Sequence, residues 1–146
     1  MTANDMTTNS PYKVRPPVIP VRVEDSMDIM IVRNTTRQAA GLLGFPPAYR
    51  AQLASAAATL AELILKTGEA HTIHVNGVRN GAQQGLQISS ETPWLAGVSA
   101  NNVLIALKSK MGDLVDEILL KWEPTPTIVM VTWVTDTRTQ IGRAHV

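Results

Sequence analysis

Apolar and polar positions change period along the chain, and each change marks a predicted element. Residues 18–24 alternate between apolar and polar side chains, which is typical of a strand, and Pro20 indicates a sheet edge because it cannot donate to a ladder. Apolar residues then recur every three or four positions over residues 25–43 and 47–67, which predicts two helices. Gly44 follows the first of them as a left-handed helix end.

The second half of the chain predicts a hairpin, a third helix and two closing strands. An Asn-Gly turn ending at Gly81 separates two segments of period two, which is a hairpin signal. A segment of helical spacing follows, and two β-rich runs end the pattern. These elements cover residues 73–78, 85–90, 101–117, 118–123 and 127–134.

The resulting order, β-α-α-β-β-α-β-β, predicts an α+β fold. We expect a two-layer sandwich in which a mixed, mostly antiparallel sheet of about five strands carries three helices on one face. The chain divides into a disordered lead-in at residues 1–17, one domain at residues 18–134 and a tail at residues 135–146. The last six residues resemble the translation of a sequencing adapter, and we expect them to be artefactual.

Composition narrows the function classes without choosing one. The chain is 45% hydrophobic and 17% charged, with a net charge of +1, so we expect neither a nucleic-acid partner nor electrostatic binding to membranes. It has no cysteine, no apolar run near the roughly 18 residues of a membrane span, and no apolar signal core at its start. We therefore expect a cytoplasmic location and no membrane partner.

Three stretches of the sequence together resemble a known family. The first, residues 21–45, is a short strand and an acidic helix start followed by the run RQAAGLLGF. The second is an Ala-rich helix closed by glycine at residues 50–68, and the third is LVDE followed by EPTPTIVMVTW, which ends at residue 133. In this order they resemble the anti-sigma-factor serine kinases, a compact branch of the histidine-kinase-like ATPase fold. The resemblance covers about residues 18–134 and implies that fold for the predicted sandwich.

Kinases of that family hold Mg²⁺ through an Asn on the second helix, with a carboxylate one turn earlier as the base. By resemblance, the base position falls on Thr59 and the Mg²⁺ position on Leu63. Magnesium requires oxygen ligands, which leucine lacks, so we expect no metal there. Glu62 leaves two interpretations open: a substitute base, or a solvated charge on the helix.

The family's remaining nucleotide elements are also altered. The adenine-reading loop corresponds to residues 91–97, which include Glu91, Thr92 and Gly97 but no aspartate. Trp94 in this loop could stack on a base or pack over the sheet. The lid segment before the third helix lacks the family's glycines, and Thr127 is the hydroxyl nearest the closing Gly-Thr position. We therefore expect no phosphate transfer and no cofactor, with ATP and Mg²⁺ bound only if the kinase is active.

Two histidines lie close together on the predicted hairpin. His71 and His74 are three positions apart, so strand alternation predicts that they point to opposite faces of the sheet. We expect them not to share a metal ion.

Three functions remain open at this point. The resemblance implies a regulatory protein that binds a sigma factor or an antagonist-domain protein by partner switching, with a possible homodimer and a degraded ATP site. One alternative is an active serine kinase that phosphorylates an antagonist protein. The other is a structural subunit unrelated to sigma-factor regulation.

Overall fold

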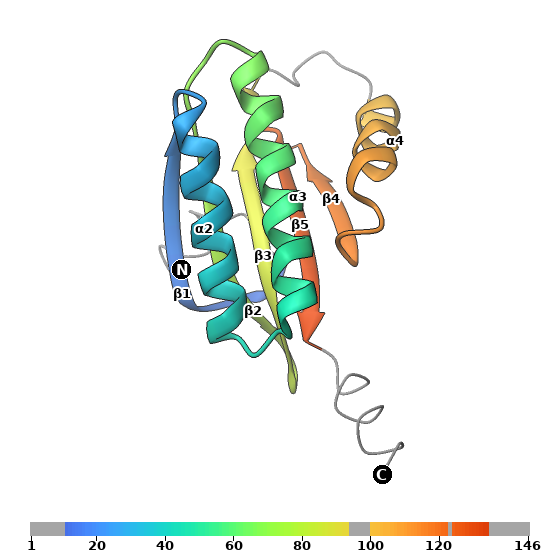
Figure 1. The fold of residues 1–146 in the computed structure, drawn as a ribbon. Coiled ribbons are helices and arrows are strands. Elements are labelled where there is room, and N and C mark those ends of the chain that lie inside the picture. Colours follow the sequence, from blue (N-terminus) through green and yellow to red (C-terminus); the bar gives the residue numbers. More distant parts are fainter. Residues whose placement is uncertain (1–10, 94–99, 123, 135–146) are drawn as a thin grey trace.

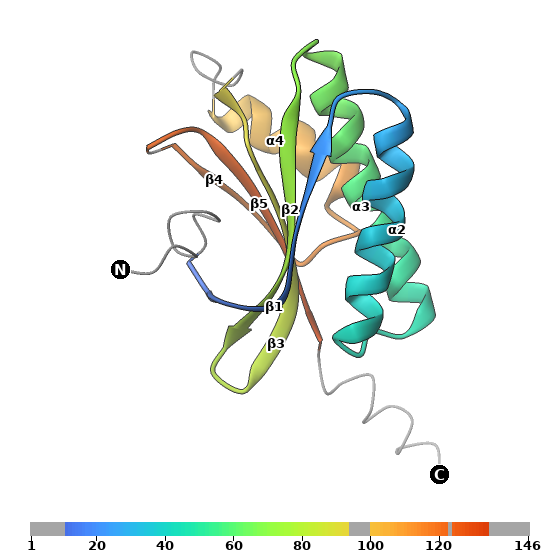
Figure 2. The same cartoon turned by 90° about the vertical axis from the view of Figure 1, so that its left-hand side faces the viewer.

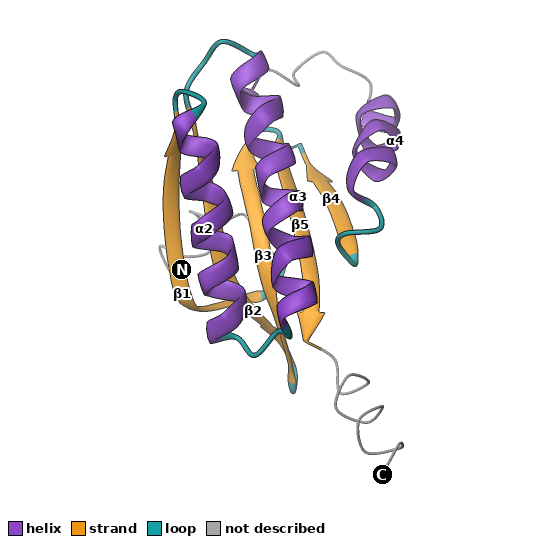
Figure 3. Cartoon of the chain, viewed as in Figure 1, coloured by secondary structure: helices purple, strands orange, loops and turns teal. Residues whose placement is uncertain are grey.

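The structure, a computed structural model, describes residues 11–93, 100–122 and 124–134. These residues form a five-stranded antiparallel sheet and three helices in the order predicted from the sequence (Figures 1 and 3). The α+β fold class is confirmed. The elements are β1 (Lys13–Val23), α2 (Met27–Leu42), α3 (Pro47–Lys66), β2 (His71–Asn80), β3 (Gln83–Glu91), α4 (Ala100–Met111), β4 (Glu117–Lys121) and β5 (Thr127–Val134).

The strands lie in the order β1-β2-β3-β5-β4, and each neighbouring pair is antiparallel. β1 is an edge strand, as Pro20 predicts. Figures 1 and 2 show α2 and α3 side by side over one face of the sheet, with α4 beside the β4 edge. The chain turns between the first two helices at Gly44, whose φ of 93° is the left-handed geometry that glycine adopts readily.

The main hydrophobic core lies between this sheet face and the helices. Alternate residues of the central strands point into it, among them Ile73 and Val75 of β2, while α3 contributes a nearly continuous inner surface of alanine and leucine. Phe45, in the turn between α2 and α3, is completely buried there. Small alanine side chains let α3 approach the sheet and α2 closely, so the helical layer is held by packing over its whole length.

The opposite face of the sheet holds a second, smaller core, which includes Val129 and Val131. At its rim Glu117 accepts one hydrogen bond at each carboxylate oxygen: Oε1 from the Tyr12 hydroxyl and Oε2 from Nε1 of Trp133, both at 2.6 Å. The two rings meet edge to face with centroids 4.9 Å apart. We call Tyr12, Glu117 and Trp133 the Glu117 clamp. It ties the start of β1 to β4, the opposite edge strand.

The disordered lead-in predicted for residues 1–17 is wrong for residues 13–17, which belong to β1. The two prolines of this stretch fit because the ladder shifts register between Arg15 and Val18. Gly77 on β2 makes room for this irregularity: a Cβ there would lie 2.8 Å from the Arg15 carbonyl oxygen. Residues 1–10 lie outside the described residues.

The third helix also differs from the prediction, which extended it to residue 117. α4 ends at Met111, and Gly112 follows. Asp116 then bonds to β5 instead of to a helix: its N–H donates to the Val131 carbonyl at 2.9 Å, and its carboxylate accepts the Trp133 N–H at 2.8 Å. Apolar residues in the connecting segment still contact the main core, and their spacing imitates a continued helix.

Candidate functional site

The positions that the family resemblance assigns to metal and base lie on α3, and their side chains serve the helix and the core. The Thr59 hydroxyl donates to the Ser55 carbonyl at 2.9 Å, one turn earlier on the same helix. Leu63 is half-buried and packs against the main core. Glu62 lies on the exposed side of the helix. Leu63 thus contributes packing where the family has a ligand oxygen.

The two threonines of the candidate nucleotide site meet where β3 ends and β5 begins. The backbone N–H and the hydroxyl of Thr92 both donate to the Pro126 carbonyl, at 2.6 and 3.1 Å, and the Thr127 hydroxyl donates to the Thr125 carbonyl at 2.9 Å. Both threonines are buried. This is also the end of the sheet toward which α3 runs (Figure 1).

These contacts decide what the assigned positions can do. The hydroxyls of Thr59, Thr92 and Thr127 each donate a hydrogen bond to a carbonyl group of the chain itself. The predicted positions Trp94 and Gly97 lie outside the described residues. In the part of the chain that the structure describes, no group of three or more acidic or histidine side chains gathers to hold a metal ion.

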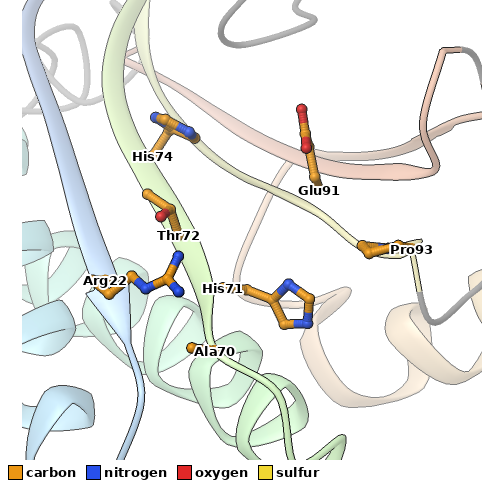
Figure 4. A pocket seen from close by; sticks show the side chains of 7 residues that line it. All are labelled: Arg22, Ala70, His71, Thr72, His74, Glu91 and Pro93. Carbon is orange, nitrogen blue, oxygen red and sulfur yellow. The ribbon is translucent and has the colours of Figure 1, made fainter.

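A cavity of about 340 Å³ opens near the same end of the sheet, and Glu91 is among its lining residues (Figure 4). His71 and His74 both line it. Their spacing predicted opposite faces of the sheet, but His71 is the first residue of β2 and reaches the rim from the strand end. Burial lowers the pKa of His74 from its usual 6.5, and the nearby Glu91 carboxylate opposes part of this shift. Nε2 of His71 lies 3.9 Å from the exposed Glu69 carboxylate.

The feature that sequence reasoning missed is the outward surface of α2. We call it the α2 outer face and define it by the helix's exposed residues: Met27, Met30, Ile31, Asn34, Arg37, Gln38 and Leu42. Four of these are large apolar side chains, with exposed fractions from 51% to 76%, and only Arg37 is charged. Exposed apolar patches of this kind mark interaction surfaces more often than ordinary solvated faces do.

The signal for this face was present in the sequence. The apolar stripe that predicts this helix includes Val32 and Ala39, which are buried, and also Leu42, which is exposed. Outside that stripe, Met27, Met30 and Ile31 lie close together at the start of the helix. The helix therefore has more apolar side chains than its contact with the core uses.

A second cavity, of about 850 Å³, lies at the C-terminal end of the α2 outer face, where α3 begins. Arg37 and Leu42 line it from α2, and Arg50 lines it from α3. This groove is at the other end of α3 from the candidate nucleotide positions (Figure 1). Its lining combines two arginines with the apolar side chain of Leu42.

Comparison with known proteins adds no family assignment. No protein-family model matches the chain, and no curated protein matches it. Of the helices in the described residues, none combines the length and apolar character that crossing a bilayer requires.

Proposed function

We propose that this protein is a regulatory binding module of the anti-sigma-factor type, which holds a sigma factor or an antagonist-domain protein through its helical layer without using ATP. The observation that carries the proposal is the α2 outer face. Four large apolar side chains stand in solvent on one helix that has a single charge on that side. Burial of such a surface is the main favourable term in protein association.

The candidate nucleotide positions support the same proposal from the opposite direction. Leu63 belongs to the core packing, and the threonine hydroxyls bond to the chain's own carbonyls. Phosphoryl transfer depends on metal ions and positioned charges around the phosphates. The use of these positions for packing therefore supports a binding function for this chain over a catalytic one.

The direct test measures binding of the purified chain to the sigma factors and antagonist-domain proteins of its source organism by isothermal titration calorimetry, with and without Mg-ATP. We expect one of them to bind with a Kd of about 1 μM or tighter, unchanged by Mg-ATP. If none of these proteins binds the chain, the proposal is contradicted. Transfer of labelled phosphate to an antagonist protein, lost in Glu62→Ala, would establish the kinase alternative instead.

Paired substitutions test whether the binding surface lies on α2. Ile31→Asp puts a charge into the α2 outer face, whereas Ile105→Asp makes the same change on α4, and these isoleucines are 51% and 67% exposed. Both variants should fold, because neither side chain is in the core. We expect Ile31→Asp to weaken partner binding about tenfold or more and Ile105→Asp to change it little. Equal losses in the two variants would remove α2 from the interface.

A further inference from the structure

The groove between the end of α2 and the start of α3 contains an arginine held in place from behind. Nε of Arg50 donates to the Phe45 carbonyl at 2.6 Å, a bond to the turn that joins the two helices. The guanidinium lies against Gly41 of α2, where a Cβ would stand 3.6 Å from Cζ and from Nε. The side chain therefore crosses the groove floor in a fixed position, and its terminal N–H groups are not used by this bond.

The positive charge of the groove is uncompensated within the described residues. The ion pairs of the described residues join Arg22 to Glu24 and His71 to Glu69, and neither involves Arg37 or Arg50. α3 begins at this groove, and its first turn has no acidic residue, so the positive end of the helix dipole adds to the field. Two arginines and a helix start thus face one opening, and within the described residues neither arginine forms an ion pair with a carboxylate.

The groove is also apolar. Leu42 is 76% exposed at its edge, and Pro47 and Ala51 of α3 add further carbon surface. A bare inorganic anion would use the arginines and leave this surface in water. A peptide that carries a carboxylate beside a large apolar side chain would use both, because an arginine fork pairs with a carboxylate through two parallel hydrogen bonds.

We infer that this groove binds an acidic and apolar segment of the partner protein, with a carboxylate held by Arg50 and Arg37 and an apolar side chain packed on Leu42. The inference rests on the proposed function, since it names the part of a protein partner that this surface recognises. Arg50 is preorganised by its bond to Phe45, so little side-chain freedom is lost when the carboxylate binds. Arg37 is exposed and adds charge at the rim.

The first experiment uses two acetylated and amidated tetrapeptides, Glu-Leu-Leu-Glu and Gln-Leu-Leu-Gln, as probes in a ¹⁵N NMR titration. We expect the acidic peptide to bind about tenfold more tightly than the neutral one, with amide shifts concentrated at residues 37–51 and a shift of the Arg50 Nε–H signal. Equal affinity for the two peptides, or shifts centred elsewhere, would overturn the inference. Inorganic phosphate is titrated in parallel, and binding as tight as that of the acidic peptide would show an anion site without a peptide role.

Variants then test the named residues. Arg37→Gln should weaken binding of the acidic peptide about threefold to tenfold. The matched control is Arg33→Gln, which makes the same charge change on the same helix outside the groove and should leave this binding unchanged. Arg50→Lys keeps the charge and loses the planar fork, so we expect a loss at least as large with folding retained, checked by circular dichroism. Leu42→Ser should weaken both peptides alike. An equal effect of Arg33→Gln and Arg37→Gln would contradict the assignment.

The partner experiment separates this inference from the proposed function. If the partner binds Arg37→Gln and Leu42→Ser as tightly as the unchanged chain, the groove is not the recognition site and the proposed function stands. If the acidic peptide binds as expected but no sigma factor or antagonist-domain protein does, the groove stands and the regulatory assignment fails.

Discussion

The two ends of α3 use their polar groups in opposite ways. At its C-terminal end, where the resemblance places the nucleotide site, Leu63 is packed and the hydroxyls of Thr92 and Thr127 donate to carbonyls of the chain. At its N-terminal end, Arg50 makes one backbone bond and keeps the rest of its guanidinium toward a groove. We call the first the closed end of α3, because these hydroxyls donate to the chain itself, and the second the open end, because Arg50 keeps N–H groups toward the groove.

The largest expected effect comes from introducing an amide side chain at the closed end of α3. Leu63→Asn should lower the free energy of unfolding by about 2 kcal/mol, because it removes apolar contacts with the core and leaves an amide half-buried. Urea denaturation measures this loss. Glu62→Gln, one position earlier and exposed, is the control and should stay within about 0.5 kcal/mol.

The same variant has a functional readout. We expect Leu63→Asn to gain no Mg-ATP binding, because the hydroxyls of Thr92 and Thr127 remain bonded to the chain. A titration that gives a Kd tighter than about 100 μM would show that a single side chain had closed the nucleotide site.

The next largest effect tests whether the threonines at the closed end are structural. Thr92→Val keeps the shape of the side chain and removes the hydroxyl that donates to Pro126, so stability should fall by about 1 kcal/mol. Thr125→Val is the control, since the bond to Thr127 uses its backbone carbonyl and not its hydroxyl. If the two variants unfold at the same urea concentration, the Thr92 hydroxyl does not hold the two strands together.

A smaller effect, of opposite sign, is expected at the open end. Gly41→Ala should stabilise the chain by about 0.5 kcal/mol, because alanine favours the helix and the new Cβ meets Arg50 at an ordinary contact distance of 3.6 Å. Gly112→Ala is the contrasting variant, since its Cβ would lie 2.5 Å from the Lys108 carbonyl oxygen and should destabilise the fold. Thermal melts compare the two, and a destabilised Gly41→Ala would mean that the groove floor is tighter than described.

The smallest expected effect is a pH dependence near the closed end. Burial lowers the pKa of His74, so the folded protein takes up this proton less readily than the unfolded chain does. Stability should therefore fall as the pH drops through 6.5, the ordinary histidine value, and continue to fall until the folded protein is protonated. His74→Gln should flatten this slope in urea midpoints measured from about pH 7.5 to 5. A slope unchanged by His74→Gln, with His71→Gln as control, would assign it to other groups.

The sequence predicted the element order well because periodicity and glycine positions are local signals. It placed β1 at an edge from Pro20 and ended two helices at glycines with positive φ, Gly44 and Gly68. It failed where tertiary contacts decide. Residues 13–17 form a strand because Gly77 admits an irregular backbone, and α4 stops early because Asp116 bonds to β5.

The candidate site was harder to predict for a physical reason. Resemblance identified residues such as Leu63 and Thr127, and the structure shows what each of them contacts. The groove depends on a hydrogen bond between Arg50 and the turn at Phe45. Such a contact has no repeated pattern along the chain. The availability of a charged group is a property of packing, which spacing does not encode.

The Glu117 clamp has a consequence for how the protein is made. Tyr12 and Glu117 are separated by 105 positions, and Trp133 completes the contact near the end of β5. During synthesis, the first strand leaves the ribosome long before its anchoring carboxylate exists. The nascent chain can pair β1 with β2 and cover them with α2 and α3. The contact between Tyr12 and Glu117, which joins the β1 edge of the sheet to β4, forms only after translation has passed β5.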